Sequence, residues 1–285
     1  MQGKTILITG ANSGIGYETA LALAEKGARV IIGVRRPEKG VAAAEKIRGQ
    51  FPKAAVEVLP LDLSSCVSIE NFADNIKERI PALDVLINNA GMMRSTYETT
   101  EEGFELQIGV NHFGPFLLTR RLLDQLKAAP EPRVITVSSS SHYGAKMDFE
   151  RFRSDKGRYK GMPAYGQAKL ANVLFASELA RRHPEIRSYS LHPGVVGTRI
   201  VRPEKAGWLF TLGWTLFKPF TFSAKRGAKT SIFLATTAPP PEPNGQYFDE
   251  HQRAMTPSRL ARDEDLAREL WEISEQMWKE VGADF

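Results

Sequence analysis

The fold is decided by the stretch Thr9-Gly10-Ala11-Asn12-Ser13-Gly14-Ile15-Gly16, which separates the apolar run Thr5–Thr9 from a helical pattern that begins at Gly14. Glycines between a strand and a helix remove the Cβ atoms that would block a tight bend, and they let a phosphate approach the helix N-terminus. The spacing is G-x-x-x-G-x-G rather than G-x-G-x-x-G. The alternative is a turn that only connects two elements. We expect a dinucleotide pyrophosphate to be bound by Gly10, Asn12, Ser13, Gly14, Ile15 and Gly16.

Short β-branched runs and longer helical patterns alternate on both sides of this turn. Strands are expected at Thr5–Thr9, Arg29–Val34, Val56–Leu61, Val85–Asn88, Val134–Ser138, Ser188–Leu191 and Gln246–Phe248. Helices are expected at Gly14–Lys26, Glu38–Gln50, Ser65–Arg79, Phe116–Lys127, Tyr165–Arg182 and Asp263–Lys279. Strict alternation requires crossover connections, and nearly all-apolar strands are typical of a sheet covered on both faces. The fold class is therefore α/β, a doubly wound parallel sheet of about seven strands with helices on both faces.

Composition excludes several classes of protein. The 285 residues are 42% hydrophobic and 25% charged, which is ordinary for a globular chain and excludes a disordered or fibrous one. The net charge of +5 is mild and requires no nucleic-acid partner. Cys66 is the single cysteine, so no internal disulfide can form, which favours a reducing compartment. Neither a signal peptide nor a spanning apolar stretch is present, so we expect a cytoplasmic protein.

The second strand ends in Gly33-Val34-Arg35-Arg36. A fold that prefers NAD usually places a carboxylate here to bind the ribose 2′-hydroxyl, whereas an arginine matches a 2′-phosphate. The first acid, Glu38, lies beyond that position. We therefore expect Arg35 and Arg36 to bind a 2′-phosphate, and NADP(H) to be preferred over NAD(H). The alternative is a pair of solvated loop arginines.

Tyr165 and Lys169 lie four residues apart in a helical pattern, so their side chains share a face. A free phenol has a pKa of about 10, which is too high for a base at neutral pH. A neighbouring ammonium favours the phenolate and lowers that pKa. We predict that Tyr165 donates and accepts a proton with a pKa lowered by Lys169. Taken alone, the Tyr-x-x-x-Lys pattern is common on surface helices, so other motifs have to support it.

Further polar residues follow the strand ends. Ser138-Ser139-Ser140-Ser141 follows one strand, and Asn88-Asn89-Ala90-Gly91 ends the strand before it. In a parallel sheet these ends meet at the edge where a ligand binds. Asn111 precedes the helix expected from Phe116. Local backbone hydrogen bonds would also explain some of the serines, and helix capping would explain Asn111.

These motifs together resemble the short-chain dehydrogenase/reductase family, and in particular its retinol dehydrogenase-like and WW-domain oxidoreductase-like branch. The motifs that match, in the order of the family, are Thr9–Gly16, Asp62-Leu63, Asn88–Gly91, Asn111, the serines 138–141, Tyr165 with Lys169, and Pro193-Gly194 with Thr198. The resemblance implies a single Rossmann-type domain over residues 1–285, with a cofactor-binding and catalytic core at 1–198.

The resemblance also implies a role for each matching residue. Tyr165 is the general acid and base, Ser139 binds the substrate oxygen, and Lys169 holds the nicotinamide ribose. Asn111 anchors a water that links Lys169 to solvent. The other implied cofactor contacts are Asp62 and Leu63 at the adenine, Asn89, Ala90 and Gly91 along the floor, and Pro193, Val196 and Thr198 in the motif at the carboxamide.

Residues 199–229 carry seven basic residues, one acid and six aromatic residues. The resemblance implies that this segment is a lid over an apolar substrate. A second interpretation is peripheral membrane contact through residues 206–217, and a third is a helix packed on the core. No stacking platform or recognition helix is present, so no nucleic acid is expected.

The five histidines show no paired spacing of metal ligands, so no metal is expected. For the assembly, the resemblance implies a homodimer or tetramer that pairs through the helices at Phe116–Lys127 and Tyr165–Arg182.

The sequence thus predicts an NADP(H)-dependent oxidoreductase that interconverts a lipophilic aldehyde or ketone and its alcohol by hydride transfer. The alternative is a non-catalytic NADP(H)-binding sensor or scaffold with the same fold, which would not need Asn111, Ser139, Tyr165 and Lys169 together. A nucleotide-sugar epimerase also uses Tyr-x-x-x-Lys, but the glycine spacing and the lack of a large C-terminal substrate domain disfavour it.

Overall fold

A computed structural model describes residues 1–153, 159–196 and 222–285. Within these residues eight strands form one sheet, in the order β3-β2-β1-β4-β5-β6-β7-β8. The strands are β1 (Thr5–Thr9), β2 (Arg29–Val34), β3 (Val56–Pro60), β4 (Val85–Asn88), β5 (Arg133–Val137), β6 (Arg187–Leu191), β7 (Tyr247–Phe248) and β8 (Ala254–Met255). Neighbours from β3 to β7 are parallel, which confirms the predicted fold class, and β8 adds an antiparallel edge strand that was not predicted.

The strand order reverses next to β1. The chain runs outward from β1 to β2 and β3, then returns to place β4 on the other side of β1. Helices that follow β1 and β4 therefore leave the sheet on opposite faces and open a crevice at the carboxyl ends of these strands. The glycine turn lies at this reversal, directly after β1.

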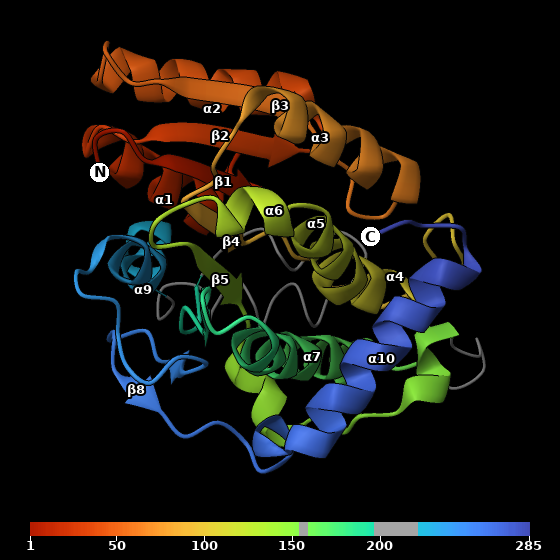
Figure 1. The fold of residues 1–285 in the computed structure, drawn as a ribbon. Helices are drawn as coiled ribbons and strands as arrows, with labels where there is room; N and C mark the ends of the chain where they lie inside the picture. The colour runs from red at the N-terminus through yellow and green to blue at the C-terminus, as the bar shows by residue number, and fades with distance from the viewer. Residues whose placement is uncertain (154–158, 197–221) are drawn as a thin grey trace, which may run out of the picture.

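Helices cover both faces of the sheet (Figure 1). Alternate residues of β1 point to opposite faces of the sheet. Ile6 and Ile8 pack with α1, α2 and α9 on one face, whereas Leu7 packs with α3, α5, α7 and α10 on the other. The helices are α1 (Gly14–Glu25), α2 (Pro37–Gln50), α3 (Cys66–Arg79), α4 (Leu106–Ile108), α5 (Gly114–Arg121), α6 (Leu123–Lys127), α7 (Gly161–Arg182), α9 (Ala224–Thr236) and α10 (Glu264–Glu280).

The helix predicted at Phe116–Lys127 differs most from the structure. It begins earlier, as a π-helical turn over Gly109–Phe113 that continues into α5, and it is interrupted at Leu122 before α6. Pro115 lies in the first turn of α5 and, because it has no N–H, donates no hydrogen bond back to the π-helical turn. A Cβ on Gly114 would collide with the carbonyl oxygen of Leu63, so the glycine lets α5 approach the loop after β3 closely.

The C-terminal helix α10 packs across α5 and α7 (Figure 1). The ring of Trp271 lies parallel to that of Phe175 on α7 at 5.9 Å and edge-on to that of Phe116 on α5 at 5.0 Å. The indole of Trp278 donates a hydrogen bond of 3.0 Å to the carbonyl oxygen of Phe113. Thus α10 covers the face of α5 and α7 through which pairing with a second copy was expected.

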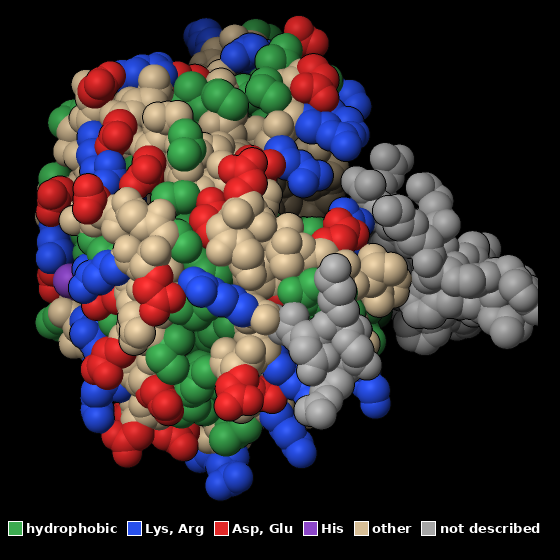
Figure 2. Space-filling view, turned by 90° about the vertical axis from the view of Figure 1, so that its right-hand side faces the viewer, with side chains coloured by type: hydrophobic (Ala, Val, Ile, Leu, Met, Phe, Trp, Pro, Cys, Tyr) green, Lys and Arg blue, Asp and Glu red, His purple; other side chains and the backbone are tan. Residues whose placement is uncertain are grey.

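Basic and acidic side chains are interspersed on the face shown in Figure 2. Among the residues described, no helix combines the length and the apolar character needed to cross a bilayer. Thr198, residues 199–221 of the expected lid and the expected membrane contact at 206–217 all lie outside the described residues.

Candidate active site

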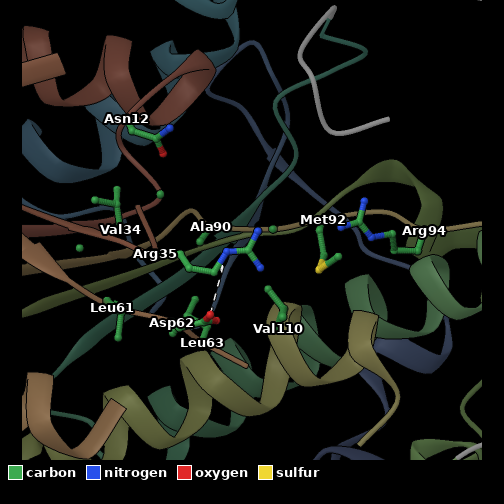
Figure 3. Close-up of a pocket in the computed structure, with 13 residues that line it drawn as sticks. Asn12, Val34, Arg35, Leu61, Asp62, Leu63, Ala90, Met92, Arg94 and Val110 are labelled. Atoms are coloured by element: carbon green, nitrogen blue, oxygen red, sulfur yellow. Dashed lines mark ion pairs between the residues drawn. The ribbon is translucent and has the colours of Figure 1, made fainter. Parts of the chain in front are cut away.

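A pocket of about 260 Å³ opens at the carboxyl ends of β1 to β4 (Figure 3). A crevice at a reversal of strand order is where α/β sheets hold their ligands. Seven of the lining residues were predicted to bind a cofactor, namely Gly10, Asn12, Arg35, Asp62, Leu63, Ala90 and Gly91. The others are Gly33, Val34, Leu61, Met92, Arg94 and Val110.

The glycine turn is held against the end of β4. Gly10 has a φ of +70°, and a Cβ on it would lie 3.0 Å from the Cα of Ala90. A Cβ on Gly16 would lie 2.5 Å from Nδ2 of Asn89, which itself donates to the carbonyl oxygen of Thr9 at 2.8 Å. The Thr9 hydroxyl accepts from the N–H groups of Asn89 and Ala90 at 3.1 and 2.9 Å. Because these backbones meet so closely, the turn requires glycine.

The first turn of α1 follows the glycine turn directly, although Ser13, Gly14, Ile15 and Gly16 do not themselves line the pocket. Ser13 precedes the helix in an extended conformation, and its side chain makes no capping hydrogen bond in the described chain. No acid lies in the first turn. The partial positive charge of a helix N-terminus, together with free N–H groups, favours a pyrophosphate here. The predicted residues of this first turn are Gly14, Ile15 and Gly16.

Arg35 and Asp62 lie next to each other in the pocket, one after β2 and the other after β3 (Figure 3). Nε of Arg35 lies 4.0 Å from a carboxylate oxygen of Asp62 (Figure 3). Asp62 is held by Ser64, whose N–H and hydroxyl donate to it at 3.0 and 2.6 Å. Arg36 is exposed, precedes α2, and does not line the pocket. Both arginines were expected to bind the 2′-phosphate, but only Arg35 lines the pocket.

Tyr165 and Lys169 are both buried on α7. The ammonium of Lys169 lies 5.6 Å from the centre of the Tyr165 ring. It donates a hydrogen bond of 3.0 Å to the carbonyl oxygen of Val137, at the end of β5. In return, the Ser138 hydroxyl donates to the carbonyl oxygen of Lys169 at 2.6 Å. These two bonds fix α7 against the carboxyl edge of the sheet, while neither Tyr165 nor Lys169 is among the residues that line the pocket.

Burial is the main cause of the pKa shifts of Tyr165 and Lys169. Desolvation raises the pKa of Tyr165 to about 12, and a hydrogen bond with the Ser139 side chain acts in the opposite direction. Desolvation also lowers the pKa of Lys169 to about 8. The prediction that Lys169 lowers the pKa of Tyr165 is therefore wrong in direction for this structure. The ammonium lies beside the ring and is bonded to Val137, so it does not offset the loss of water around the phenol.

Ser139 is the serine of the run that acts on Tyr165. Its hydroxyl donates to Oγ of Ser141 at 3.1 Å and accepts from the N–H of Ser141 at the same distance. Ser138 instead bonds to α7, as described above. The short helical turn over Ser140–Gly144 follows, with Ser139 as its N-cap.

Asn111 lies in the π-helical turn and is almost fully buried. Its side-chain oxygen accepts from the N–H of Met92, and its amide nitrogen donates to the Met92 carbonyl oxygen, both at 2.9 Å. A Cβ on Gly91 would lie 2.7 Å from that side-chain oxygen and 3.3 Å from Nζ of Lys169. Asn111, Lys169 and the end of β4 therefore meet at one point, and such irregular helical turns are frequent at functional sites.

The motif after β6 is described in part. Pro193 follows β6 after one residue, and Gly194 has a φ of +74°. A Cβ on Gly227 of α9 would lie 2.7 Å from the Val196 side chain and 3.2 Å from that of Ile15. Val196 therefore packs close to the first turn of α1, on the pocket side of the sheet.

His142 is a site residue that the sequence did not reveal. It is fully buried, and its Nδ1 lies 2.8 Å from the carbonyl oxygen of Ser139. Its Nε2 accepts a hydrogen bond of 3.2 Å from the N–H of Ser258, so Nδ1 carries the proton and donates to Ser139. Burial lowers the pKa of His142, which keeps the ring neutral at physiological pH. Only the fold brings residues 139, 142 and 258 together, and no sequence motif marks the contact.

Replacing His142 with Leu should lower kcat by about 10- to 100-fold, because the carbonyl group of Ser139 loses its buried donor and the adjacent hydroxyl is displaced. His142→Asn keeps a donor near Nδ1 and should retain most of the activity. Steady-state kinetics with a thermal melt of each variant tests this. Equal kcat for the Leu variant and the native enzyme would show that His142 does not hold Ser139.

Comparison with known proteins agrees with this geometry. The family model described as short chain dehydrogenase matches residues 4–207, so the chain belongs to the short-chain dehydrogenase/reductase family. It is an enzyme of that family, within the retinol dehydrogenase-like branch. It is 44% identical to retinol dehydrogenase 12 of Homo sapiens, over 96% of this chain and 86% of that protein. It is 41% identical to the WW domain-containing oxidoreductase of Gallus gallus, over 98% of this chain and 69% of that protein.

Solved structures share the fold. The crystal structure of an uncharacterized protein from Mycobacterium Paratuberculosis superposes with a TM-score of 0.78 at 36% identity, covering 98% of this chain and 94% of the other. A gluconate 5-dehydrogenase from Burkholderia cenocepacia J2315, solved in complex with NADP and tartrate, superposes with a TM-score of 0.68 at 23% identity, covering 87% and 94%.

Proposed function

We propose that this enzyme uses NADP(H) to interconvert a lipophilic aldehyde or ketone and its alcohol, with Tyr165 as the group that moves the proton. The observation that carries the proposal is the burial of Tyr165 and Lys169 together, beside Ser139 and Asn111, at the edge of the sheet that holds the pocket. A surface helix would expose such a pair.

The pocket fits a dinucleotide. Glycine at positions 10 and 16 lets the turn pack directly against Ala90 and Asn89 beside the pocket, and the first turn of α1 supplies backbone donors for a pyrophosphate. Arg35 at the end of β2 suits a 2′-phosphate, which supports NADP(H) over NAD(H). The bound nicotinamide supplies the hydride.

The protonation states favour reduction. With a pKa near 12, the Tyr165 phenol is neutral at physiological pH and holds the proton that a reduced carbonyl oxygen needs. Ser139 can bind the same oxygen and then the phenolate that Tyr165 leaves. Lys169, with a pKa of about 8, is charged at neutral pH and can hold a ribose hydroxyl. Asn111 keeps Met92 and the end of β4 in place next to Lys169.

The substrate class rests on two supports. Met92 and Val110 give the pocket apolar walls beyond the glycine turn. Relatives at 41–44% identity include proteins named retinol dehydrogenases, whose name indicates a lipophilic alcohol. A screen of retinal and other lipophilic aldehydes and ketones, with NADPH and NADH in parallel, tests the proposal. Binding of NADPH without oxidation by any carbonyl compound would favour a sensor or scaffold instead.

Replacing Arg35 with Ser should raise the KM for NADPH by about 30-fold, since a charge-assisted bond to phosphate contributes about 2 kcal/mol. The KM for NADH should change little, because NADH has no 2′-phosphate. Arg36→Ser is the matched comparison, and we expect a much smaller effect because Arg36 does not line the pocket. Equal effects of the two changes on the KM for NADPH would contradict this assignment.

A further inference from the structure

The pocket contains a second cation, Arg94, and we propose that it binds an anionic group, in the simplest case a carboxylate, at one end of the substrate. The inference rests on the proposed function and adds the substrate class to it. The favoured substrate is then an aldehyde or ketone with an apolar body and a negatively charged end.

Arg94 lies at one end of the pocket, and Met92 lies between it and Arg35, whose guanidinium reaches the middle of the pocket in Figure 3. Arg35 follows β2, whereas Arg94 follows β4, beyond Met92 (Figure 3). The carbonyl oxygen of Arg94 packs against Gly161, the first residue of α7. Gly161 precedes Tyr165 by one helical turn, or about 6 Å along the axis. Arg94 therefore lies beside the start of α7, the helix that carries the proton donor Tyr165, whereas Arg35 lies at the end of β2, where a ribose phosphate is expected.

The backbone of Arg94 is fixed by a buried side chain. The N–H of Arg94 donates to Oε1 of Gln107 at 3.1 Å, and Nε2 of Gln107 donates to the carbonyl oxygens of Arg94 and Gly161 at 3.3 and 2.9 Å. Gln107 is fully buried. The side-chain amide of Gln107 thus joins the loop after β4 to the start of α7 and fixes the backbone of Arg94. Binding of a ligand to the guanidinium then costs less conformational entropy, because only the Arg94 side chain has to be ordered.

The guanidinium of Arg94 has N–H groups without a hydrogen-bond partner among the described residues. The side chain is 16% exposed, and its Nε is buried without a hydrogen-bond partner. Glu98 forms an ion pair with that Nε at 3.7 Å, which is too long for a hydrogen bond, and Glu98 is itself 40% exposed. Within the described chain, none of the guanidinium nitrogens makes a hydrogen bond. A guanidinium carries five N–H donors in a planar fork, and a carboxylate fills two of them at once.

The neighbours of Arg94 suit the rest of such a molecule. Met92 and Val110 line the pocket next to it and offer apolar contact to a chain or ring. The other source of negative charge is the cofactor, whose phosphates are drawn to Arg35 and to the first turn of α1. These lie toward β1 and β2, away from the start of α7, so the geometry favours the substrate as the source of the anion.

The experiment compares acids with their neutral esters. Terephthalaldehydic acid and azelaic semialdehyde, each beside its methyl ester, present the same aldehyde with and without a charge at two lengths. Arg94→Met should lower kcat/KM for at least one acid by about 10- to 100-fold and change both esters by no more than about twofold. Arg94→Lys should recover part of the loss. Arg262→Met, at an exposed position outside the pocket, is the control and should match the native enzyme.

Three outcomes would overturn the proposal. An equal loss for acid and ester would show that Arg94 only supports the pocket, and a raised KM for NADPH in Arg94→Met would assign the cation to the cofactor. Calorimetric titration of the acids into the protein with NADP⁺ tests the anion site of Arg94 independently of the proposed reaction. If the native enzyme reduces none of the aldehydes, the proposed function fails, while acid binding that Arg94→Met abolishes would still establish the anion site. Acids that bind no better than esters would refute it.

Discussion

Replacing Tyr165 with Phe should lower kcat for carbonyl reduction by at least about 10³-fold, because the variant has no proton to give to the reduced oxygen. The change removes one oxygen from a buried side chain and leaves its ring in place on α7. Binding of NADPH, measured by quenching of protein fluorescence, should stay within about twofold, since the phenol hydroxyl contributes little to ground-state affinity.

Tyr143→Phe is the matched control for that experiment. Tyr143 lies on the turn after Ser139, is 45% exposed, and donates its hydroxyl to the carbonyl oxygen of Thr256. It should keep nearly native kcat. Measurable turnover by Tyr165→Phe, at a rate close to that of Tyr143→Phe, would remove Tyr165 from the mechanism.

Replacing Lys169 with Met should lower kcat by about 10²-fold or more and at the same time stabilise the fold by about 2–3 kcal/mol at neutral pH. Lys169 is a fully buried ammonium whose one hydrogen bond in the described chain goes to Val137. Its pKa of about 8 lies below the ordinary value of 10.5. Burial of the charge therefore costs stability at every pH below 8, where both folded and unfolded chains hold the proton.

The pH dependence gives this prediction its sign. Between pH 8 and 10.5 the unfolded chain still binds the proton that folded Lys169 has released, so the native free energy of unfolding should rise with pH in that window. The advantage of the Met variant should shrink over the same window. Denaturant titrations at several pH values measure it, with the exposed Lys53→Met as control. A Met variant that is less stable than the native enzyme at neutral pH would show that the buried ammonium of Lys169 does not lower the free energy of unfolding.

The features that were predicted best from the sequence are those that depend only on residues close together in the chain. The bounds of β1, β2 and β4 agree with the structure because each is an apolar run that ends in a turn, and the glycine turn requires both its residues and its place after β1. The pair of Tyr165 and Lys169 was found because helix periodicity alone places them on one face. These features need no knowledge of distant contacts.

What depends on burial or on distant neighbours was missed. The pKa of Tyr165 is governed by desolvation, which a one-dimensional pattern does not contain. His142 acquires its role through Ser258, more than a hundred residues away, and Arg94 faces the pocket only because Gln107 and Gly161 hold its backbone. The two-residue strand β8 is too short to show any periodicity. The interrupted helix at Leu122 likewise has no breaker in its sequence.

The position of α10 has a consequence for self-association. Copies of this chain that meet through α5 and α7 would first have to uncover Phe116 and Phe175, which Trp271 now shields from water. An assembly must therefore use a different surface, or exchange its C-terminal helices between subunits. In the second case Trp271 would keep the same packing partners on the other subunit, so dilution would change the size of the assembly and not the emission of Trp271.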